Sequence, residues 1–122
     1  MQVFLVEDSP LIRDRLLALL GSVPGAQVCG HANNAAAAVR EILATRPDVV
    51  VLDIALADGT GFDVLRAVRD QAPDIDVYLL SNHAAYPYRQ LAERLGARGF
   101  FDKSREFGAM RDVVVQRAAV SQ

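Results

Sequence analysis

The sequence of 122 residues contains one cysteine, so a disulfide within the chain is excluded. Cys29 and the two histidines, His31 and His83, are too few to form a structural zinc site. Uncharged runs fall short of the roughly 20 apolar residues that a membrane-spanning helix needs. The amino terminus lacks the basic start of a signal peptide. We therefore expect a soluble cytoplasmic domain that does not enter a membrane.

Neither sign of charge dominates, since the sequence has 13 basic and 15 acidic residues and a formal net charge of −2. This balance argues against the basic surface of a protein that binds nucleic acid directly. A hydrophobic content of 52% allows a buried core, and the length allows one domain. We expect a single domain over residues 1–122, with no output domain. Lysine is scarce as well: Lys103 is the single lysine of the sequence, and all the remaining Lys and Arg positions are arginine.

Short apolar runs alternate with segments of helical periodicity, and glycine or proline separates most of them. Strands are predicted at 3–6, 26–30, 48–53, 76–81 and 98–101. Helices are predicted from Pro10 to about 20, from the cap Asn34 to 45, from the turn at Gly59 and Gly61 to 72, from Pro87 to Gly96, and over 107–120. This alternation predicts an α/β fold in which a five-stranded parallel sheet is covered by helices on both faces.

Several side chains outside the predicted strand ends have simple structural interpretations. Cys29 is predicted to be a small core residue. His31 is predicted to lie in a loop or at a strand end. Tyr88 falls on the apolar stripe of its helix and is predicted to be in the core. Tyr86 is the better candidate for contact with a partner protein.

Polar residues stand where four of the predicted strands end. Glu7 and Asp8 follow the first strand, Asp53 ends the third, Ser81 ends the fourth, and Lys103 follows the fifth. Sites in open α/β sheets form beyond the carboxyl ends of the strands. We therefore expect three carboxylates, one hydroxyl and one ammonium to meet at one edge of the sheet.

Three clustered carboxylates repel one another and raise each other's pKa, so such a cluster persists when a cation occupies it. Oxygen ligands favour a hard divalent ion, Mg²⁺ (or Mn²⁺), over zinc. A metal, the Lys103 ammonium and a hydroxyl together suit a phosphoryl group. A carboxylate inside such a site can act as the nucleophile and form an acyl phosphate.

Five motifs in this order and spacing resemble the receiver domain of two-component response regulators. The motifs are residues 3–9 (VFLVEDS), 47–53 (PDVVVLD), 58–61 (DGTG), 79–82 (LLSN) and 96–103 (GARGFFDK). Together they cover essentially the whole chain. The resemblance implies a flavodoxin-like, doubly wound (βα)5 fold with strand order 2-1-3-4-5.

The resemblance also implies roles for the acidic residues. Asp53 would accept a phosphoryl group from a phosphohistidine on a sensor histidine kinase or a phosphotransfer protein. Asp8 and Asp53 would bind Mg²⁺ directly, together with the backbone carbonyl of Ala55. Glu7 would help through a water molecule.

Further roles concern the response to phosphorylation. Ser81 would hydrogen-bond the phosphoryl group and Lys103 would pair with it. Phe100 would be the switch aromatic, which turns inward as Ser81 moves. This motion would change the face formed by the fourth helix, the fifth strand and the fifth helix, a face open to an output protein or to a homodimer. His83 is either a modulator of dephosphorylation or an ordinary surface histidine.

Two positions depart from the pattern of the family. The residue after Lys103 is usually proline in a cis peptide, and here it is Ser104. Because a cis bond before a residue other than proline costs about 2.5–4 kcal/mol, we predict a trans bond and a rearranged loop. Ala57 replaces a common proline, which favours a less rigid loop after Asp53.

Three alternative functions fit parts of the sequence. The chain could be the receiver fragment of a DNA-binding transcriptional regulator. The segment from Asp58 to Thr60 faintly resembles an aspartyl-phosphate hydrolase of the haloacid dehalogenase kind, although Ala55 stands where that class has a second acid. A receiver that binds partners without phosphate is the third, and the complete set of polar residues argues against it.

Overall fold

The computed structural model describes residues 1–82 and 86–120, with only the backbone of Tyr86 included. The predictions made for His83 and for the Tyr86 side chain lie outside these residues. The strands are β1 (Gln2–Val6), β2 (Gln27–Ala32), β3 (Val49–Asp53), β4 (Ala55–Leu56), β5 (Gly59–Thr60), β6 (Asp76–Ser81) and β7 (Gly99–Asp102). The helices are α1 (Pro10–Gly21), α2 (Ala35–Thr45), α3 (Gly61–Gln71), α4 (Tyr86–Arg94) and α5 (Phe107–Val120).

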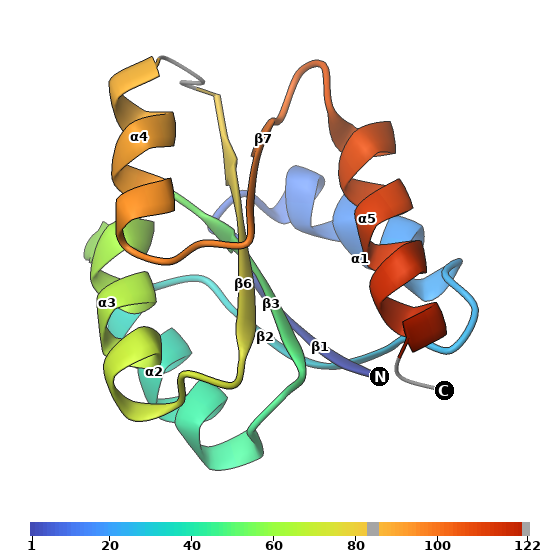
Figure 1. Cartoon of the computed structure of the whole chain (residues 1–122), viewed down its shortest axis with the longest axis horizontal. Coiled ribbons are helices and arrows are strands. Elements are labelled where there is room, and N and C mark those ends of the chain that lie inside the picture. Colours follow the sequence, from blue (N-terminus) through green and yellow to red (C-terminus); the bar gives the residue numbers. More distant parts are fainter. Residues whose placement is uncertain (83–85, 121–122) are drawn as a thin grey trace.

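The main sheet has five strands in the order β2-β1-β3-β6-β7, and all of its neighbours are parallel (Figure 1). Counted along the chain without the short β4 and β5, this is the order 2-1-3-4-5, so the predicted fold is confirmed. Where only a turn was predicted, β4 and β5 form a two-residue antiparallel hairpin. That hairpin follows β3 directly and therefore stands next to the carboxyl edge of the sheet.

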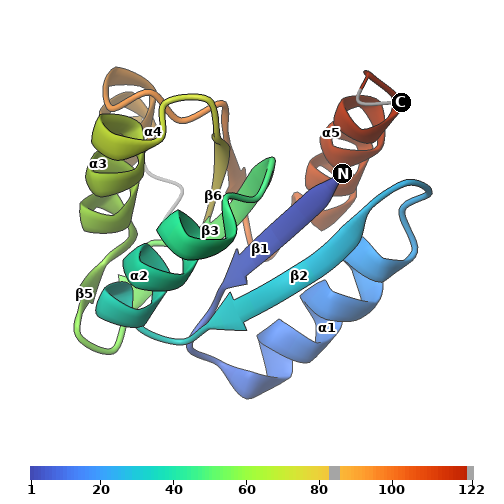
Figure 2. The same cartoon turned by 90° about the horizontal axis from the view of Figure 1, so that it is seen from below.

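Helices cover both faces of the sheet, as Figures 1 and 2 show. On one face, α2, α3 and α4 pack against alternate residues of the central strands, among them Val50 and Leu52. On the other face, α1 and α5 pack against the intervening residues, such as Val49 and Val51. All five residues of β3 are buried, which explains its uninterrupted apolar sequence.

Side-chain caps define where three of the helices begin. The Ser9 hydroxyl accepts the N–H of Ile12 at the start of α1, and Pro10 follows in the first turn. Asn34 caps α2 as predicted. Thr60 and Asp63 form a reciprocal capping box at the start of α3. Ser9 directly follows Glu7 and Asp8, so its cap starts α1 next to the end of β1.

Two predictions of burial are wrong. Cys29 is exposed, because β2 is an edge strand and its side chains alternate between partial cover and solvent. Tyr88 is 43% exposed and stacks on Phe62 of α3, with the two ring centroids 6.4 Å apart, since Ala92 is the residue that α4 buries in the core. His31 lies at the end of β2, as predicted. Among the described residues, no helix combines the length and apolar character needed to cross a membrane.

Candidate functional site

The polar residues predicted at the strand ends are held there by continuation of the sheet's hydrogen bonds. The N–H of Glu7, just beyond β1, donates to the carbonyl of Ala32 over 3.0 Å. The N–H of Lys103, just beyond β7, donates to the carbonyl of Ser81 over 2.9 Å. Asp53 is the last residue of β3 and Ser81 the last residue of β6. Four strands therefore deliver these residues to one edge of the sheet, as expected.

The side chain of Lys103 lies between two buried carboxylates. Its Nζ is 2.7 Å from Oε1 of Glu7 and 2.8 Å from Oδ2 of Asp53. Glu7 and Asp53 are only 1% and 4% exposed, and Ser81 is 2% exposed. A buried charge is tolerated when it is paired, and one ammonium here serves two carboxylates. The single lysine of the sequence therefore lies at this edge, where its ammonium offsets part of the negative charge of the carboxylates.

Burial and mutual contact shift the pKa values of Glu7 and Lys103. Desolvation raises the pKa of Glu7, the charge of Asp53 reinforces that rise, and Lys103 opposes it. Burial by itself would lower the pKa of Lys103, but its bonds to Asp53 and Glu7 outweigh that effect and raise its pKa. The ammonium is therefore charged at neutral pH.

Carboxylate oxygens of Glu7, Asp8 and Asp53 all lie within 4.8 Å of one another. Asp8 is exposed, so this cluster opens to solvent on the side of Asp8. Glu7 is already engaged through both oxygens, since Oε2 accepts the N–H of Ser9 over 3.2 Å while Oε1 pairs with Lys103. A set of three hard oxygen donors at this spacing fits a divalent cation such as Mg²⁺.

The β4–β5 hairpin is attached to the site at both ends. Oδ1 of Asp53 accepts the N–H of Ala55 over 3.3 Å, and the N–H of Gly61 donates to the carbonyl of Ile54 over 2.7 Å. At the tip, the carboxylate of Asp58 accepts the N–H groups of Ala35 and Ala36, over 2.5 and 3.1 Å, at the start of α2. These bonds hold the pKa of Asp58 below its usual value. Asp58 thus supplies an anchor in a loop that has Ala57 instead of proline.

We expect Asp58→Ala to loosen the hairpin, because within the described part of the chain the Asp58 carboxylate is the acceptor for the N–H groups of Ala35 and Ala36. Asn34→Ala is the matched control, since it removes a cap from the same helix and leaves Asp58 in place. Amide hydrogen exchange over residues 55–60 should accelerate in Asp58→Ala and stay at the wild-type rate in Asn34→Ala. Equal exchange in the two variants would show that Asp58 does not anchor the hairpin.

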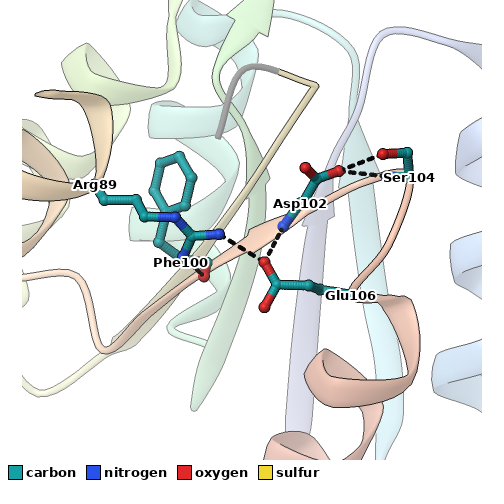
Figure 3. A network of polar contacts seen from close by, with 5 residues as sticks. All are labelled: Arg89, Phe100, Asp102, Ser104 and Glu106. Atoms are coloured by element: carbon teal, nitrogen blue, oxygen red, sulfur yellow. Dashed lines mark hydrogen bonds and ion pairs between the residues drawn. The ribbon is translucent and has the colours of Figure 1, made fainter. Parts of the chain in front are cut away.

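The loop after Lys103 is a hydrogen-bonded turn without a cis peptide bond. The N–H and the hydroxyl of Ser104 both donate to Oδ1 of Asp102, over 2.7 and 2.6 Å (Figure 3). The described residues contain no cis peptide, so the trans bond predicted between Lys103 and Ser104 is confirmed. The two hydrogen bonds from Ser104 to Asp102 hold the turn where the family usually has a proline. They also lower the pKa of Asp102.

Phe100 lies in β7, half-buried, and a charged side chain of α4 covers it. The guanidinium carbon of Arg89 is 4.9 Å from the centroid of the Phe100 ring. Arg89 also forms an ion pair of 2.6 Å with Glu106, at the start of α5 (Figure 3). The sequence indicated neither the ion pair of Arg89 with Glu106 nor the bonds of Asp58 to the start of α2, because these partners lie 17 and 22–23 positions apart along the chain.

A family model for the response regulator receiver domain matches residues 3–115. Among curated proteins, the DNA-binding transcriptional activator DevR/DosR of Mycobacterium tuberculosis is 33% identical over 130 aligned positions, which cover 98% of this chain and 60% of that protein. Protein-glutamate methylesterase/protein-glutamine glutaminase 5 of Anaeromyxobacter dehalogenans is 37% identical over 117 positions, which cover 85% of this chain and 32% of that protein. The chain therefore spans 60% or less of the length of these two relatives.

Solved structures lead to the same family. The signal receiver domain of the putative response regulator NarL from M. tuberculosis superposes with a TM-score of 0.88 at 30% identity, covering 97% of this chain and 95% of that one. A LuxR-family two-component response regulator from Aurantimonas superposes with a TM-score of 0.90 at 26% identity, covering 97% and 84%. The family match, the sheet order and the acidic edge agree, and the chain belongs to the response regulator receiver domains.

Proposed function

We propose that this receiver domain acts in the cytoplasm and takes a phosphoryl group onto Asp53 from a phosphohistidine of a sensor histidine kinase or phosphotransfer protein. The observation that carries the proposal is the contact of Lys103 with both Asp53 and Glu7 at the carboxyl edge of the sheet. A fixed ammonium beside a carboxylate provides the positive charge that a transferring phosphoryl group needs. Membership of the receiver family supports the same chemistry.

In the proposed transfer, an oxygen of the Asp53 carboxylate attacks the phosphorus atom. The new P–O bond forms as the P–N bond to the donor imidazole breaks, and the imidazole leaves with the bonding electron pair. The product is an acyl phosphate, so no oxidant or reductant is needed. Lys103 then pairs with an oxygen of the phosphoryl group, and the Ser81 hydroxyl donates a hydrogen bond to it.

The acidic cluster fits a metal ion, and we propose that Asp8 and Asp53 hold Mg²⁺ (or Mn²⁺) directly with the backbone carbonyl of Ala55. When bound, the ion would neutralise charge on the phosphoryl oxygens. For Glu7 we propose an indirect role through a water molecule. Glu7 belongs to the same carboxylate cluster and is held in place by Lys103 and by the N–H of Ser9, which supports a position beside the ion.

We expect Asp8→Asn to weaken Mg²⁺ binding by about tenfold or more, because it removes a charged ligand from the cluster. Asp14→Asn is the control, since it removes an exposed carboxylate from α1, outside the cluster. Titration of each variant with Mg²⁺, followed by NMR, measures the affinity. Wild-type affinity in Asp8→Asn would contradict the proposed metal site.

We also propose that Ser81 and Phe100 form the switch, and that phosphorylation remodels the face formed by α4, β7 and α5. The buried position of Ser81 and the half-buried position of Phe100 on the adjacent strand support this assignment. That face would meet an output protein or a second copy of the chain.

A second candidate output is DNA binding by a regulator of which this chain is the receiver. It is favoured by the likeness to DevR/DosR, a DNA-binding transcriptional activator of which the chain spans 60%. In either case we propose that the chain itself signals through protein contact, since its formal charge of −2 does not favour direct binding to nucleic acid.

Acetyl phosphate with Mg²⁺ tests the proposed function without knowledge of the kinase. We expect the intact protein to gain the mass of one phosphoryl group, and Asp53→Asn to gain none. A receiver turns over no external metabolite, so phosphate release beyond slow hydrolysis of its own acyl phosphate is not expected. Steady release of phosphate from a range of phosphorylated metabolites would instead support the hydrolase alternative.

A further inference from the structure

One arginine of α4 holds Phe100 in two ways (Figure 3). Nη1 of Arg89 donates to the backbone carbonyl of Phe100 over 3.0 Å. The guanidinium also lies over the ring of the same residue, 4.9 Å from the centroid. Arg89 and Phe100 line a cavity of about 810 Å³ between α4 and β7. Because the ring borders this open space, close packing does not hold it from every side, and the guanidinium contact contributes to its position.

The same arginine is tied to the loop that carries Lys103. Nη2 of Arg89 donates to Oε1 of Glu106 over 2.6 Å, and the N–H of Asp102 donates to that same oxygen over 3.0 Å. One carboxylate oxygen therefore joins α4 to the last residue of β7. Lys103, the next residue along the chain, reaches Asp53 over 2.8 Å. A continuous series of contacts thus runs from the acidic edge to α4.

We propose that Arg89 and Glu106 form a latch that holds Phe100 half-exposed and α4 against β7 in the unphosphorylated domain. The inference rests on the proposed function, in which Phe100 turns inward after phosphorylation. Turning the ring away from Arg89 gives up the contact with the guanidinium, so the latch favours the resting conformation. Arg89 is a positioning residue in this proposal and makes no contact with the phosphoryl group.

The expected effect follows from linkage between the two conformations. A cation over an aromatic ring at a partly exposed site changes such an equilibrium by about two- to fivefold. A ligand that favours the switched conformation binds more tightly when that conformation becomes easier to reach. Removal of the latch should therefore strengthen binding of a phosphoryl mimic by about the same factor.

The test measures the affinity of the full chain for beryllium fluoride, a mimic of the phosphoryl group, in the presence of Mg²⁺. We expect Arg89→Ala to bind about two- to fivefold more tightly than the wild type. Arg94→Ala removes an exposed arginine from the same helix and should bind like the wild type. Glu106→Gln keeps an acceptor for the N–H of Asp102 and loses the ion pair, so it should shift the affinity in the same direction. Unchanged or weaker binding by Arg89→Ala overturns the latch.

Failure of the proposed function gives a different result. If the wild type takes up no beryllium fluoride, the assignment of Asp53 as the phosphoryl acceptor fails. The latch is then tested by hydrogen exchange on the protein without any ligand. Hydrogen exchange of the Asp102 amide should then be faster in Arg89→Ala than in Arg94→Ala, because Arg89 orients the Glu106 oxygen that accepts this N–H. Equal exchange in the two variants overturns the latch.

Discussion

Gly61→Ala is expected to lower the free energy of unfolding by about 1–3 kcal/mol, because the structure has no space for a β-carbon at this position. A Cβ at Gly61 would overlap the carbonyl oxygen of Asp53 and stand 3.0 Å from Cα of Ile54. These are backbone atoms and cannot turn aside as a flexible side chain would. The N–H of Gly61 also donates to the carbonyl of Ile54 over 2.7 Å, so α3 begins in direct contact with the chain that follows β3.

Gly108→Ala is the matched control for this substitution. A Cβ at Gly108, in the first turn of α5, would meet nothing within 4 Å. Alanine is the better helix former, so Gly108→Ala should leave stability unchanged or raise it by up to about 1 kcal/mol. Chemical denaturation measures both variants. If Gly61→Ala unfolds at the same denaturant concentration as Gly108→Ala, a β-carbon at position 61 does not clash with the backbone of Asp53.

The second large effect is expected from Lys103→Met, which leaves Glu7 and Asp53 buried without their shared ammonium. Removing one partner from a buried ion pair costs about 3–5 kcal/mol, since the remaining charge is uncompensated. We expect a loss of this size in the metal-free protein at neutral pH. Arg66→Met is the control, because the ion pair of Arg66 with Asp63 is exposed and worth at most about 1 kcal/mol.

The loss in Lys103→Met should depend on pH. Without Lys103, the pKa of Glu7 rises further above its ordinary value of 4.5, because burial and Asp53 then act unopposed. The native state binds this proton more tightly than the unfolded state. The free energy of unfolding should therefore fall as pH rises from 4.5 to the native pKa of Glu7, and stay low above it.

The wild type should behave differently at the alkaline end. The pKa of Lys103 is raised above 10.5 in the native state. Its stabilising effect is therefore complete below pH 10.5 and lost as the pH rises through the native pKa.

Denaturant titrations of the wild type and of Lys103→Met across pH 5–8 should show that the difference in stability between them becomes smaller as the pH falls. A deficit that does not change over this range would contradict the burial of Glu7 beside Lys103.

The order of strands and helices could be predicted from local patterns, because each buried strand is a short apolar run and most helices have a side-chain cap or are followed by a glycine. Asp48 to Asp53 illustrates this, since its Val-Val-Val-Leu core is buried on both faces as expected. The position of polar residues at strand ends followed from the same reasoning. Glu7, Asp53 and Lys103 meet because parallel strands bring their carboxyl ends to one edge.

Contacts across the fold could not be predicted in the same way. Asp58 bonds to the start of α2, 22 and 23 residues earlier, and Arg89 bonds to Glu106, 17 residues later. No local pattern indicates such partners. The burial of Cys29 and Tyr88 was misjudged for a related reason, because it depends on which neighbouring elements cover an edge strand and the first turn of a helix.

Acceptance of the phosphoryl group by Asp53 is tested most directly by locating the modification. Borohydride reduces an aspartyl phosphate to homoserine and leaves a free carboxylate unchanged. The full chain, treated with acetyl phosphate and Mg²⁺ and then reduced, should yield a peptide with homoserine at position 53 alone. Homoserine at position 8 or 58, or its absence from a protein that has gained phosphoryl mass, would contradict the assignment of Asp53 as the acceptor.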